Sequence, residues 1–175
     1  MRIYQQSENK NEEALRTLEK AYSYAPFDPQ LAYNLAFEYA EAKNSKALSL
    51  TDSLLGFPAA QEQAEPYYIK GVYYHNVGNS AQAMQWYDRA IQQDYNFLDA
   101  HMDKGRLLFD QKKYEAAFKT FSLPATITPT YADAYYWMGR SQEALNQKEE
   151  AKLNYQRAYS LDKSLTEAKE AAQKL

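Results

Sequence analysis

Residues 64–97 read AEPYYIKGVYYHNVGNSAQAMQWYDRAIQQDYNF, and residues 132–165 read ADAYYWMGRSQEALNQKEEAKLNYQRAYSLDKSL. When the two stretches are aligned, a glycine, an alanine and an aromatic residue fall at the same positions, and a third copy lies midway between them. The three sets are Gly71, Ala83 and Tyr87; Gly105, Ala117 and Phe121; and Gly139, Ala151 and Tyr155. A fixed period of 34 residues predicts one helical unit that is copied and stacked along the chain.

The small residues of this period mark places where two helices approach closely. Glycine inside a helix costs about 1 kcal/mol relative to alanine, so its recurrence at the eighth position of a unit indicates a packing contact that offsets the cost. We expect each unit to form an antiparallel pair, with the glycine on an A helix and the alanine on a B helix. The sequence therefore predicts an all-α solenoid of helix pairs, with little room for strands.

The period divides the chain into four full units: 29–63, 64–97, 98–131 and 132–165. In the first unit the alanine of the B helix comes one residue early, and the turn that begins at Gly56 carries two extra residues. Residues 166–175 are polar on most sides and are predicted to form a capping helix, which terminal repeats need. We expect all units to form one continuous domain.

Residues 1–28 match mainly the B helix of a further, partial unit. Either the array is cut from a longer one, which we favour, or it begins with half a repeat. In both cases Leu15, Leu18 and Tyr22 are predicted to lack a partner on one side. This open end predicts self-association.

Three short signals predict helix starts. Asp28 precedes Pro29, which is the pattern of an N-cap followed by proline at the first helical position. Two further pairs resemble capping boxes, in which a side chain before the helix and an acidic residue in its first turn bond the backbone. They are Thr130 with Asp133 and Ser164 with Glu167.

Composition excludes several classes of function. The net charge of −3, with 20 basic and 23 acidic residues interleaved, argues against a nucleic-acid partner, which requires a basic stripe. The absence of cysteine excludes disulfides and thiolate metal sites. No apolar run approaches the roughly 18 residues of a membrane-spanning helix, and residues 1–10 lack the apolar core of a signal peptide. We therefore expect a soluble chain without direct membrane insertion, cytoplasmic or periplasmic; its richness in Tyr, Asn and Gln hints at a bacterial source.

The phased residues resemble the tetratricopeptide repeat family. Its motif has a bulky fourth residue, leucine at the seventh position, glycine or alanine at the eighth and tyrosine at the eleventh. Alanine follows at the twentieth position, an aromatic residue at the twenty-fourth, alanine at the twenty-seventh and proline at the thirty-second. The unit that begins at Ala64 matches at Tyr67, Gly71, Tyr74, Ala83, Tyr87 and Ala90, and the unit that begins at Ala132 matches at Tyr135, Met138, Gly139, Ala151, Tyr155 and Ala158. The resemblance implies a right-handed superhelix whose A helices line a concave groove, and it implies protein binding rather than catalysis.

Three residues depart from the family motif. Lys70 and Lys104 occupy the seventh position, where the family prefers leucine. Pro124 occupies the twenty-seventh position of its unit, where the family has alanine. Because proline removes a backbone hydrogen bond and crowds the preceding turn, the B helix of that unit is predicted to kink or end near Ser122 and Leu123.

The resemblance implies that positions 2, 5, 6, 9, 12 and 13 of each unit face the groove, and these columns are rich in large apolar residues. Such a patch is typical of a binding surface, and Tyr and Trp are typical anchors. The candidate partner-binding residues are Tyr33, Asn34, Phe37, Tyr68, Ile69, Val72, His75, Met102, Arg106, Phe109, Tyr136, Trp137 and Arg140. Neighbouring A helices also bury parts of these columns, so half of the aromatic stripe is equally explained as core between repeats.

The two arginines admit two interpretations. Arg106 and Arg140 lie one repeat apart and would hold an acidic group of the partner. Alternatively, Arg106 pairs with Asp103 or Asp110, and Arg140 lies over the ring of Trp137. Family members that grip the carboxylate end of a chaperone use Lys and Asn in these columns. Here only Asn34 matches in type, so we expect no such clamp.

The sequence offers no catalytic or metal site. His75 and His101 lie on different helices, and the acids beside His101, Asp99 and Asp103, point away from it on a helix. We therefore expect a packed histidine, no cofactor and no enzyme activity within these residues. The leading hypothesis is a scaffold that binds a peptide or helix with apolar anchors, inside a larger assembly. The alternatives are a rigid or self-associating spacer in a longer protein, and a regulatory array attached to an enzyme.

Overall fold

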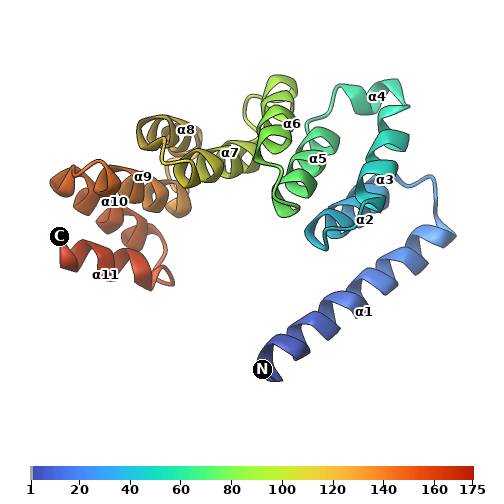
Figure 1. Ribbon diagram of the computed structural model, residues 1–175, viewed down its shortest axis with the longest axis horizontal. Helices are drawn as coiled ribbons and strands as arrows, with labels where there is room; N and C mark the ends of the chain where they lie inside the picture. The colour runs from blue at the N-terminus through green and yellow to red at the C-terminus, as the bar shows by residue number, and fades with distance from the viewer. Residues whose placement is uncertain (1) are drawn as a thin grey trace. The chain divides into compact units, whose positions relative to one another are not determined.

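The computed structural model describes the backbone of residues 2–175 and the side chains of residues 12–175. All regular elements in this part of the chain are α-helices, which Figure 1 labels in chain order. They are α1 (Arg2–Tyr24), α2 (Pro29–Glu41), α3 (Lys46–Leu55), α4 (Pro58–Gln61), α5 (Glu65–Asn76), α6 (Ser80–Gln93), α7 (Leu98–Asp110), α8 (Tyr114–Ile127), α9 (Ala132–Ala144), α10 (Lys148–Leu161) and α11 (Thr166–Lys174). None of the described helices combines the length and the apolar character that a membrane crossing requires.

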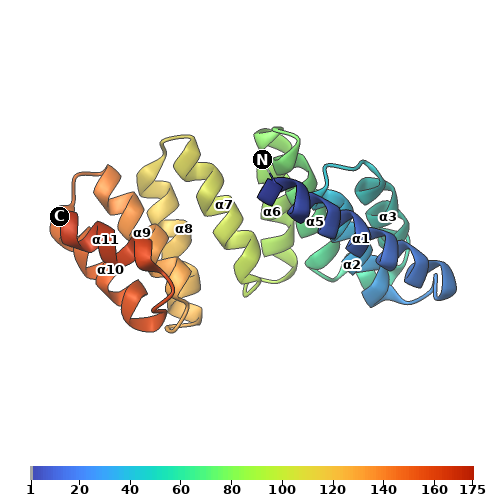
Figure 2. The same cartoon turned by 90° about the horizontal axis from the view of Figure 1, so that it is seen from below.

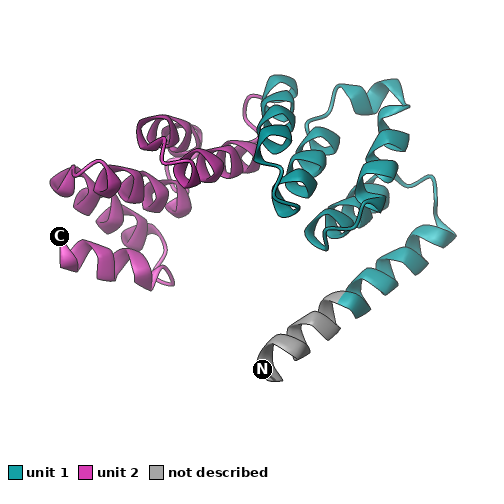
Figure 3. Cartoon of the chain, in the orientation of Figure 1, with its two compact units in different colours: residues 1–94 teal, residues 95–175 magenta. Residues whose placement is uncertain are grey.

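The helices group into two compact units, residues 1–94 and residues 95–175 (Figure 3). Unit 1 holds α1 to α6, and unit 2 holds α7 to α11. The expectation of one continuous domain stays a prediction, and each unit is described by itself below.

Within each unit, A and B helices pack as pairs. In unit 1 the pairs are α2 with α3 and α5 with α6; in unit 2 they are α7 with α8 and α9 with α10. Figure 2 shows α9 and α10 side by side, with α11 against α10. The prediction of an all-α fold built from helix pairs is confirmed. The short helix α4 was not predicted, and it occupies the irregular turn after Gly56.

The repeated glycines lie where the ring of the partner helix presses against the backbone. A Cβ atom built on Gly71 would lie under 3.0 Å from the ring of Tyr87, and one on Gly139 would lie 2.8 Å from Tyr155 Cδ1. Gly105 meets the ring of Phe121 in the same way. These aromatic side chains are fully buried. The eighth position therefore has no room for a side chain, which is the physical reason for the period.

A second repeated feature is the turn between the A and B helices of each pair. The fifteenth residue of each full unit has a positive φ angle: 57° at Lys43, 82° at Gly78, 60° at Lys112 and 62° at Asn146. Side chains rarely adopt this left-handed conformation, and glycine or asparagine adopts it most readily. Two of the four turns therefore hold a lysine under backbone strain.

The predicted helix starts have mixed outcomes. Asp28 caps α2 as predicted, because its Oδ1 accepts hydrogen bonds from Gln30 N at 2.9 Å and Leu31 N at 3.1 Å. The two predicted capping boxes are wrong. The N-cap residues of α9 and α11 are Tyr131 and Leu165, and neither makes a capping hydrogen bond through its side chain.

The sequence predicted a kink or an end of the B helix near Ser122; the end is wrong, and the kink stays a prediction. Helix α8 continues through Pro124 to Ile127. Proline removes only the bond that its own N–H would donate, and its carbonyl still accepts one from Thr128 N at 2.9 Å. The ring is fully buried, so its packing offsets the missing bond.

Candidate functional site

In unit 2, five aromatic rings from both members of the helix pairs form one cluster. Trp137 on α9 lies 5.6 Å from Phe109 on α7, measured between ring centroids, and stacks at 5.5 Å on Phe121 of α8. Tyr136 contacts Trp137 at 6.0 Å and Tyr155 at 5.8 Å. Phe109, Tyr136 and Trp137 are only half-buried. These three rings thus belong partly to the core and partly to the surface of the A helices, whereas Phe121 and Tyr155 are fully buried.

Two arginines lie over this cluster, and their contacts differ. Arg106 donates from Nη1 to Asp103 Oδ1 at 2.7 Å and lies 5.5 Å from the centroid of Trp137. Arg140 lies 4.8 Å from Phe109 and 4.7 Å from Trp137. The predicted pairing of Arg106 with Asp103 and the predicted position of Arg140 over Trp137 are both confirmed. Among the side chains that the structure describes, no carboxylate pairs with Arg140, so its guanidinium remains available to an external anion.

Beside Arg140, Tyr155 and Glu143 connect the B helix to the A helix. The Tyr155 hydroxyl donates to Glu143 Oε2 at 2.6 Å. Burial, followed by this hydrogen bond and the charge of Glu143, raises the pKa of Tyr155 well above its ordinary value. The phenol therefore stays protonated and anchors the carboxylate of Glu143 at the end of α9.

The first turn of α7 gives the same surface an acidic edge. Burial, followed by repulsion from Asp103, raises the pKa of Asp99, and Arg106 partly opposes the shift. Burial and the charges of Asp99 and Asp133 raise the pKa of Tyr131. Arg106 is thus held in an acidic environment, while Arg140 lies over aromatic rings.

In unit 1, the predicted site residues form a smaller aromatic row. Phe37 on α2 stacks on Tyr68 of α5 at 6.3 Å, and Tyr68 contacts Tyr87 of α6 at 5.8 Å. The Tyr87 hydroxyl lies 3.4 Å from His75 Nδ1. Asn34 is exposed at the edge of this row, where its Oδ1 accepts from Gln30 Nε2 at 3.1 Å.

Four predicted site residues are buried and therefore contribute chiefly to the core. Met102 is 1% exposed and belongs to the core cluster around Phe121. Ile69 and Val72 are buried on α5, and Tyr33 is buried on α2. Tyr33 is the only buried ring among the six aromatic candidates, so less of the aromatic stripe is core than the alternative interpretation expected.

No metal site is present among the described residues. In this part of the chain, His, Asp and Glu side chains do not gather in groups of three or more that could hold a metal ion. His101 is buried, its Nε2 lies 2.9 Å from the Tyr95 carbonyl oxygen, and its ring contacts that of Tyr95 at 5.7 Å. The prediction of a packed histidine is confirmed.

At the N-terminal side of unit 1, the residues predicted to be unpartnered are half-buried. The side chains of Leu15, Leu18 and Tyr22 on α1 remain partly exposed, and those of Tyr24 and Phe27 are largely exposed. The predicted self-association through this end stays a prediction.

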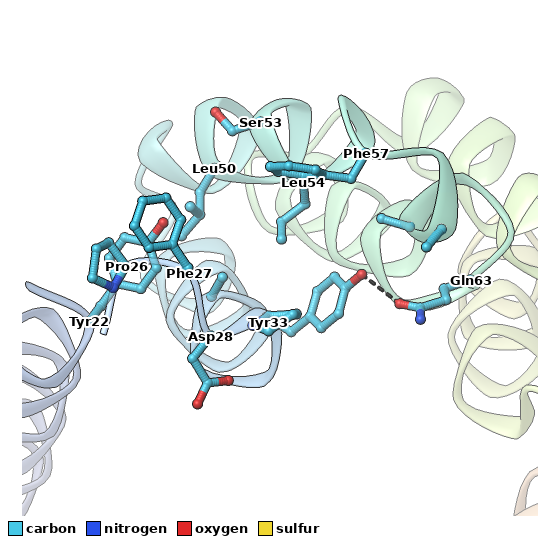
Figure 4. Close-up of a pocket in the computed structure, with 14 residues that line it drawn as sticks. Tyr22, Pro26, Phe27, Asp28, Tyr33, Leu50, Ser53, Leu54, Phe57 and Gln63 are labelled. Atoms are coloured by element: carbon cyan, nitrogen blue, oxygen red, sulfur yellow. Dashed lines mark hydrogen bonds between the residues drawn. The ribbon is translucent and has the colours of Figure 1, made fainter. Parts of the chain in front are cut away.

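Unit 1 contains a cavity of about 340 Å³ that was not predicted from the sequence. Figure 4 shows its lining residues between α2 and α3, with the turn that carries α4 closing one side. Tyr33 lies on its floor and donates from its hydroxyl to Gln63 Oε1 at 2.6 Å. The only available signal was the irregular length of unit 29–63, together with Phe27 and Phe57, which fit no column of the repeat.

Comparison with known proteins agrees with this architecture. The model of the tetratricopeptide repeat matches residues 64–97 and 132–165. RNA polymerase II-associated protein 3 of Xenopus laevis is 28% identical over 173 residues, which cover 96% of this chain and 26% of that protein. The chain spans from 6% to 26% of the length of the curated relatives that it matches.

Two solved structures extend the comparison. A thermophilic TPR protein of Thermus thermophilus superposes with a TM-score of 0.74 at 15% identity, covering 98% of this chain and 93% of that one. The first TPR of Spaghetti (RPAP3), bound to the HSP90 peptide SRMEEVD, gives a TM-score of 0.62 at 25% identity, covering 65% of this chain and 90% of that one. The chain therefore carries tetratricopeptide repeats at residues 64–97 and 132–165, where the repeat model matches directly.

Proposed function

We propose that this chain is a non-catalytic interaction module whose A helices bind a peptide or helix of a partner protein, within a larger assembly. Tetratricopeptide repeats generally mediate protein–protein interactions and typically serve as scaffolds rather than enzymes. One structural neighbour carries a bound peptide in its repeats. These relationships support the class of function, and the contacts in unit 2 support its chemistry.

The observation that carries the proposal is the position of Arg140. Its guanidinium lies over two aromatic rings, has no carboxylate partner among the described residues and is held by α9 rather than by a loop. A planar guanidinium suits bidentate binding of a carboxylate. An acidic residue of the partner would therefore bind Arg140, and an apolar residue beside it would contact Trp137 and Tyr136, whose rings are half-buried.

Unit 1 offers an apolar binding surface of its own. Phe37, Tyr68 and His75 are half-buried, and Asn34 beside them is exposed. Aromatic side chains provide large contact area and lose few rotamers on binding. This row would accept apolar side chains of the partner.

The proposed partner differs from the peptide that the structural neighbour binds. That peptide, SRMEEVD, is acidic. In this chain Tyr33, Tyr68 and Phe37 occupy columns where chaperone-binding repeats are expected to carry Lys and Asn. We therefore propose apolar anchors with one acidic group rather than a chaperone tail.

Peptide display with a charge reversal tests the proposal. A random peptide library is selected on the full chain, on the Arg140→Glu variant and on the Arg157→Glu variant. Arg157 is the matched control, because it is exposed on the B helix α10 and also lies over an aromatic ring, 5.7 Å from the centroid of Tyr135.

The full chain and the control are expected to select peptides that carry an acidic residue beside an aromatic or aliphatic one. Arg140→Glu is expected to select basic residues in place of acidic ones, because it reverses the charge over Trp137. Identical selections on all three proteins, or a change of selection with Arg157→Glu alone, would contradict the proposed role of the A-helix surface.

A further inference from the structure

The cavity in unit 1 does not include Phe37, Tyr68 or His75, the half-buried A-helix residues proposed above to bind a partner. Its walls are the N-terminal half of α2, the C-terminal half of α3 and the segment around α4, and the turn between α1 and α2 forms its rim. At about 340 Å³ it is at the small end of ligand sites, which range from about 300 to 1,000 Å³. A site of this size suits one large side chain rather than a whole helix.

The rim of the cavity carries unusually exposed aromatic rings. Phe27 is 92% exposed and Phe57 is 62% exposed, and both line the cavity (Figure 4). Leu54 and Ala60, which are buried, provide apolar walls. Exposed rings around an apolar hollow are typical of an interaction site, because apolar surface left in contact with water does not stabilise the free protein.

The lining of the cavity carries negative charge and no positive charge. Asp28 is the only charged residue among those that line it. Its Oδ1 caps α2, and its other carboxylate oxygen has no hydrogen-bond partner among the described residues. In Figure 4 the carboxylate of Asp28 lies below Phe27 and points away from Leu54, at the outer edge of the lining residues. The pKa of Tyr33 on the cavity floor is raised, first by the burial of Tyr33 and second by the negative charge of Glu65. Glu65 therefore adds to the negative potential at the cavity.

The inner end of the cavity has a polar group that suits a peptide backbone. Gln63 accepts from the Tyr33 hydroxyl through Oε1. Its side-chain nitrogen makes no hydrogen bond within the described chain, so it remains a donor. A backbone carbonyl next to an inserted side chain would accept from it.

We propose that this cavity is a second binding site, which takes an aromatic or leucine side chain of a partner peptide that has a lysine or arginine next to it. The large side chain fills the cavity between Tyr33 and Leu54, and the basic group binds the free oxygen of Asp28 at the rim. The negative charge of the rim sets this choice, since an acidic peptide would be repelled. Phe37, Tyr68 and Arg140 do not line this cavity, so the two proposals can be tested separately.

The test follows the backbone amide signals of the isotope-labelled full chain by NMR while a capped hexapeptide is added. The peptide carries a central phenylalanine followed by lysine, in a glycine and serine background. Two further peptides replace the lysine by glutamate or the phenylalanine by alanine, and phenethylammonium serves as the small-molecule probe. The expected result is a shift of the signals of Phe27, Tyr33 and Gln63, with a Kd of about 1 mM or below.

Three variants locate the interaction. Asp28→Asn keeps a residue that caps helices well and is expected to weaken binding about two- to fivefold, as for an exposed ion pair. Ala59→Trp places a ring into the cavity from its exposed wall and is expected to weaken binding at least about tenfold. Ala42→Trp is the matched control, since Ala42 is exposed at the far end of α2 and does not line the cavity.

Several results would overturn the proposal. They are an absence of shifts at the cavity, shifts confined to α9, equal affinity for the lysine and glutamate peptides, and binding of phenethylammonium as tight as that of the peptide. Signals at the cavity that change with protein concentration alone would assign it to a second copy of this chain and would likewise reject the peptide site.

Discussion

Substitution of Gly105 by alanine tests whether the repeated glycine exists to admit the ring of the B helix. A Cβ atom at this position would lie under 3.0 Å from three atoms of the Phe121 ring, whereas ordinary van der Waals contact begins at 3.4 Å. Phe121 is completely buried among Met102, Ala117, Ala125 and Ala134, so the ring has no space into which to move. Overpacking of a buried site costs about 1 to 3 kcal/mol.

The same substitution also has a favourable effect. Alanine stabilises a helix by about 1 kcal/mol relative to glycine. For a fully enclosed ring we take the upper half of the overpacking range, about 2 to 3 kcal/mol. Gly105→Ala is therefore expected to lower the free energy of unfolding of unit 2 by about 1 to 2 kcal/mol.

A second variant is expected to reverse the sign of the stability change that Gly105→Ala causes. Phe121→Leu removes two of the three ring atoms that the new Cβ would meet, Cε1 and Cζ. The remaining Cδ atoms of leucine can rotate away from the new Cβ, so adding Gly105→Ala in this background is expected to be nearly neutral or to stabilise by up to about 1 kcal/mol. The coupling energy of the double-mutant cycle should then be about 1 to 3 kcal/mol.

Urea unfolding followed by tryptophan fluorescence measures these energies. A Trp86→Phe background leaves Trp137 as the only tryptophan, and Trp137 stacks directly on Phe121. A stabilising effect of Gly105→Ala in the otherwise unchanged chain, or a coupling energy near zero, would refute the steric explanation of the 34-residue period.

Three further predictions concern other features of the structure. Lys112→Gly is expected to raise the free energy of unfolding by about 1 kcal/mol in chemical denaturation, because it relieves the left-handed backbone at φ 60°; the neighbouring Lys113→Gly, at φ −88°, should lower it. Because the pKa of Tyr155 is raised in the folded protein, its protonated hydroxyl contributes its full stabilisation below about pH 10, and this contribution is lost as the pH rises further. In Tyr155→Phe the free energy of unfolding should therefore fall less steeply with pH in the alkaline range. An unchanged slope would contradict the bond to Glu143. The side chain of Lys70 is 8% exposed between a carboxylate and an indole ring; Lys70→Leu should change thermal stability by less than about 1 kcal/mol, while Lys70→Ala should cost about 2 kcal/mol or more through the cavity it leaves.

The sequence was sufficient to predict the helix pairs because small residues repeat in phase. At Gly71, Gly105 and Gly139 the pattern and the packing have one cause, the absence of a side chain beneath a ring. The contacts of Arg106 with Asp103 and of Arg140 with Trp137 were also predictable, since residues three apart on a helix lie on one face.

The helix ends were less predictable. Thr130 and Ser164 carry the chemistry of an N-cap, yet the helices start one residue later, where Tyr131 and Leu165 are placed by tertiary packing. The prediction for Pro124 considered only the local cost of proline in a helix. The sequence does not reveal that its ring is buried.

Division of the candidate site into packed and half-buried residues also required the structure. Met102 and Tyr136 occupy the same column, but Met102 is 1% exposed and Tyr136 is half-buried, because their neighbours differ. The cavity beneath Phe27 and Phe57 could not be predicted either. It results from an irregular turn, whose path depends on α4 rather than on the period of the repeat.

Photo-crosslinking of a selected peptide tests most directly where the partner binds. Benzoylphenylalanine is placed either at Tyr136, on the A helix α9, or at Tyr159, on the B helix α10; both side chains are half-buried in the same unit. Binding through the A helices predicts a crosslink to the peptide from position 136 and none from position 159. A crosslink from position 159 alone, or crosslinks of equal yield from both positions, would contradict it.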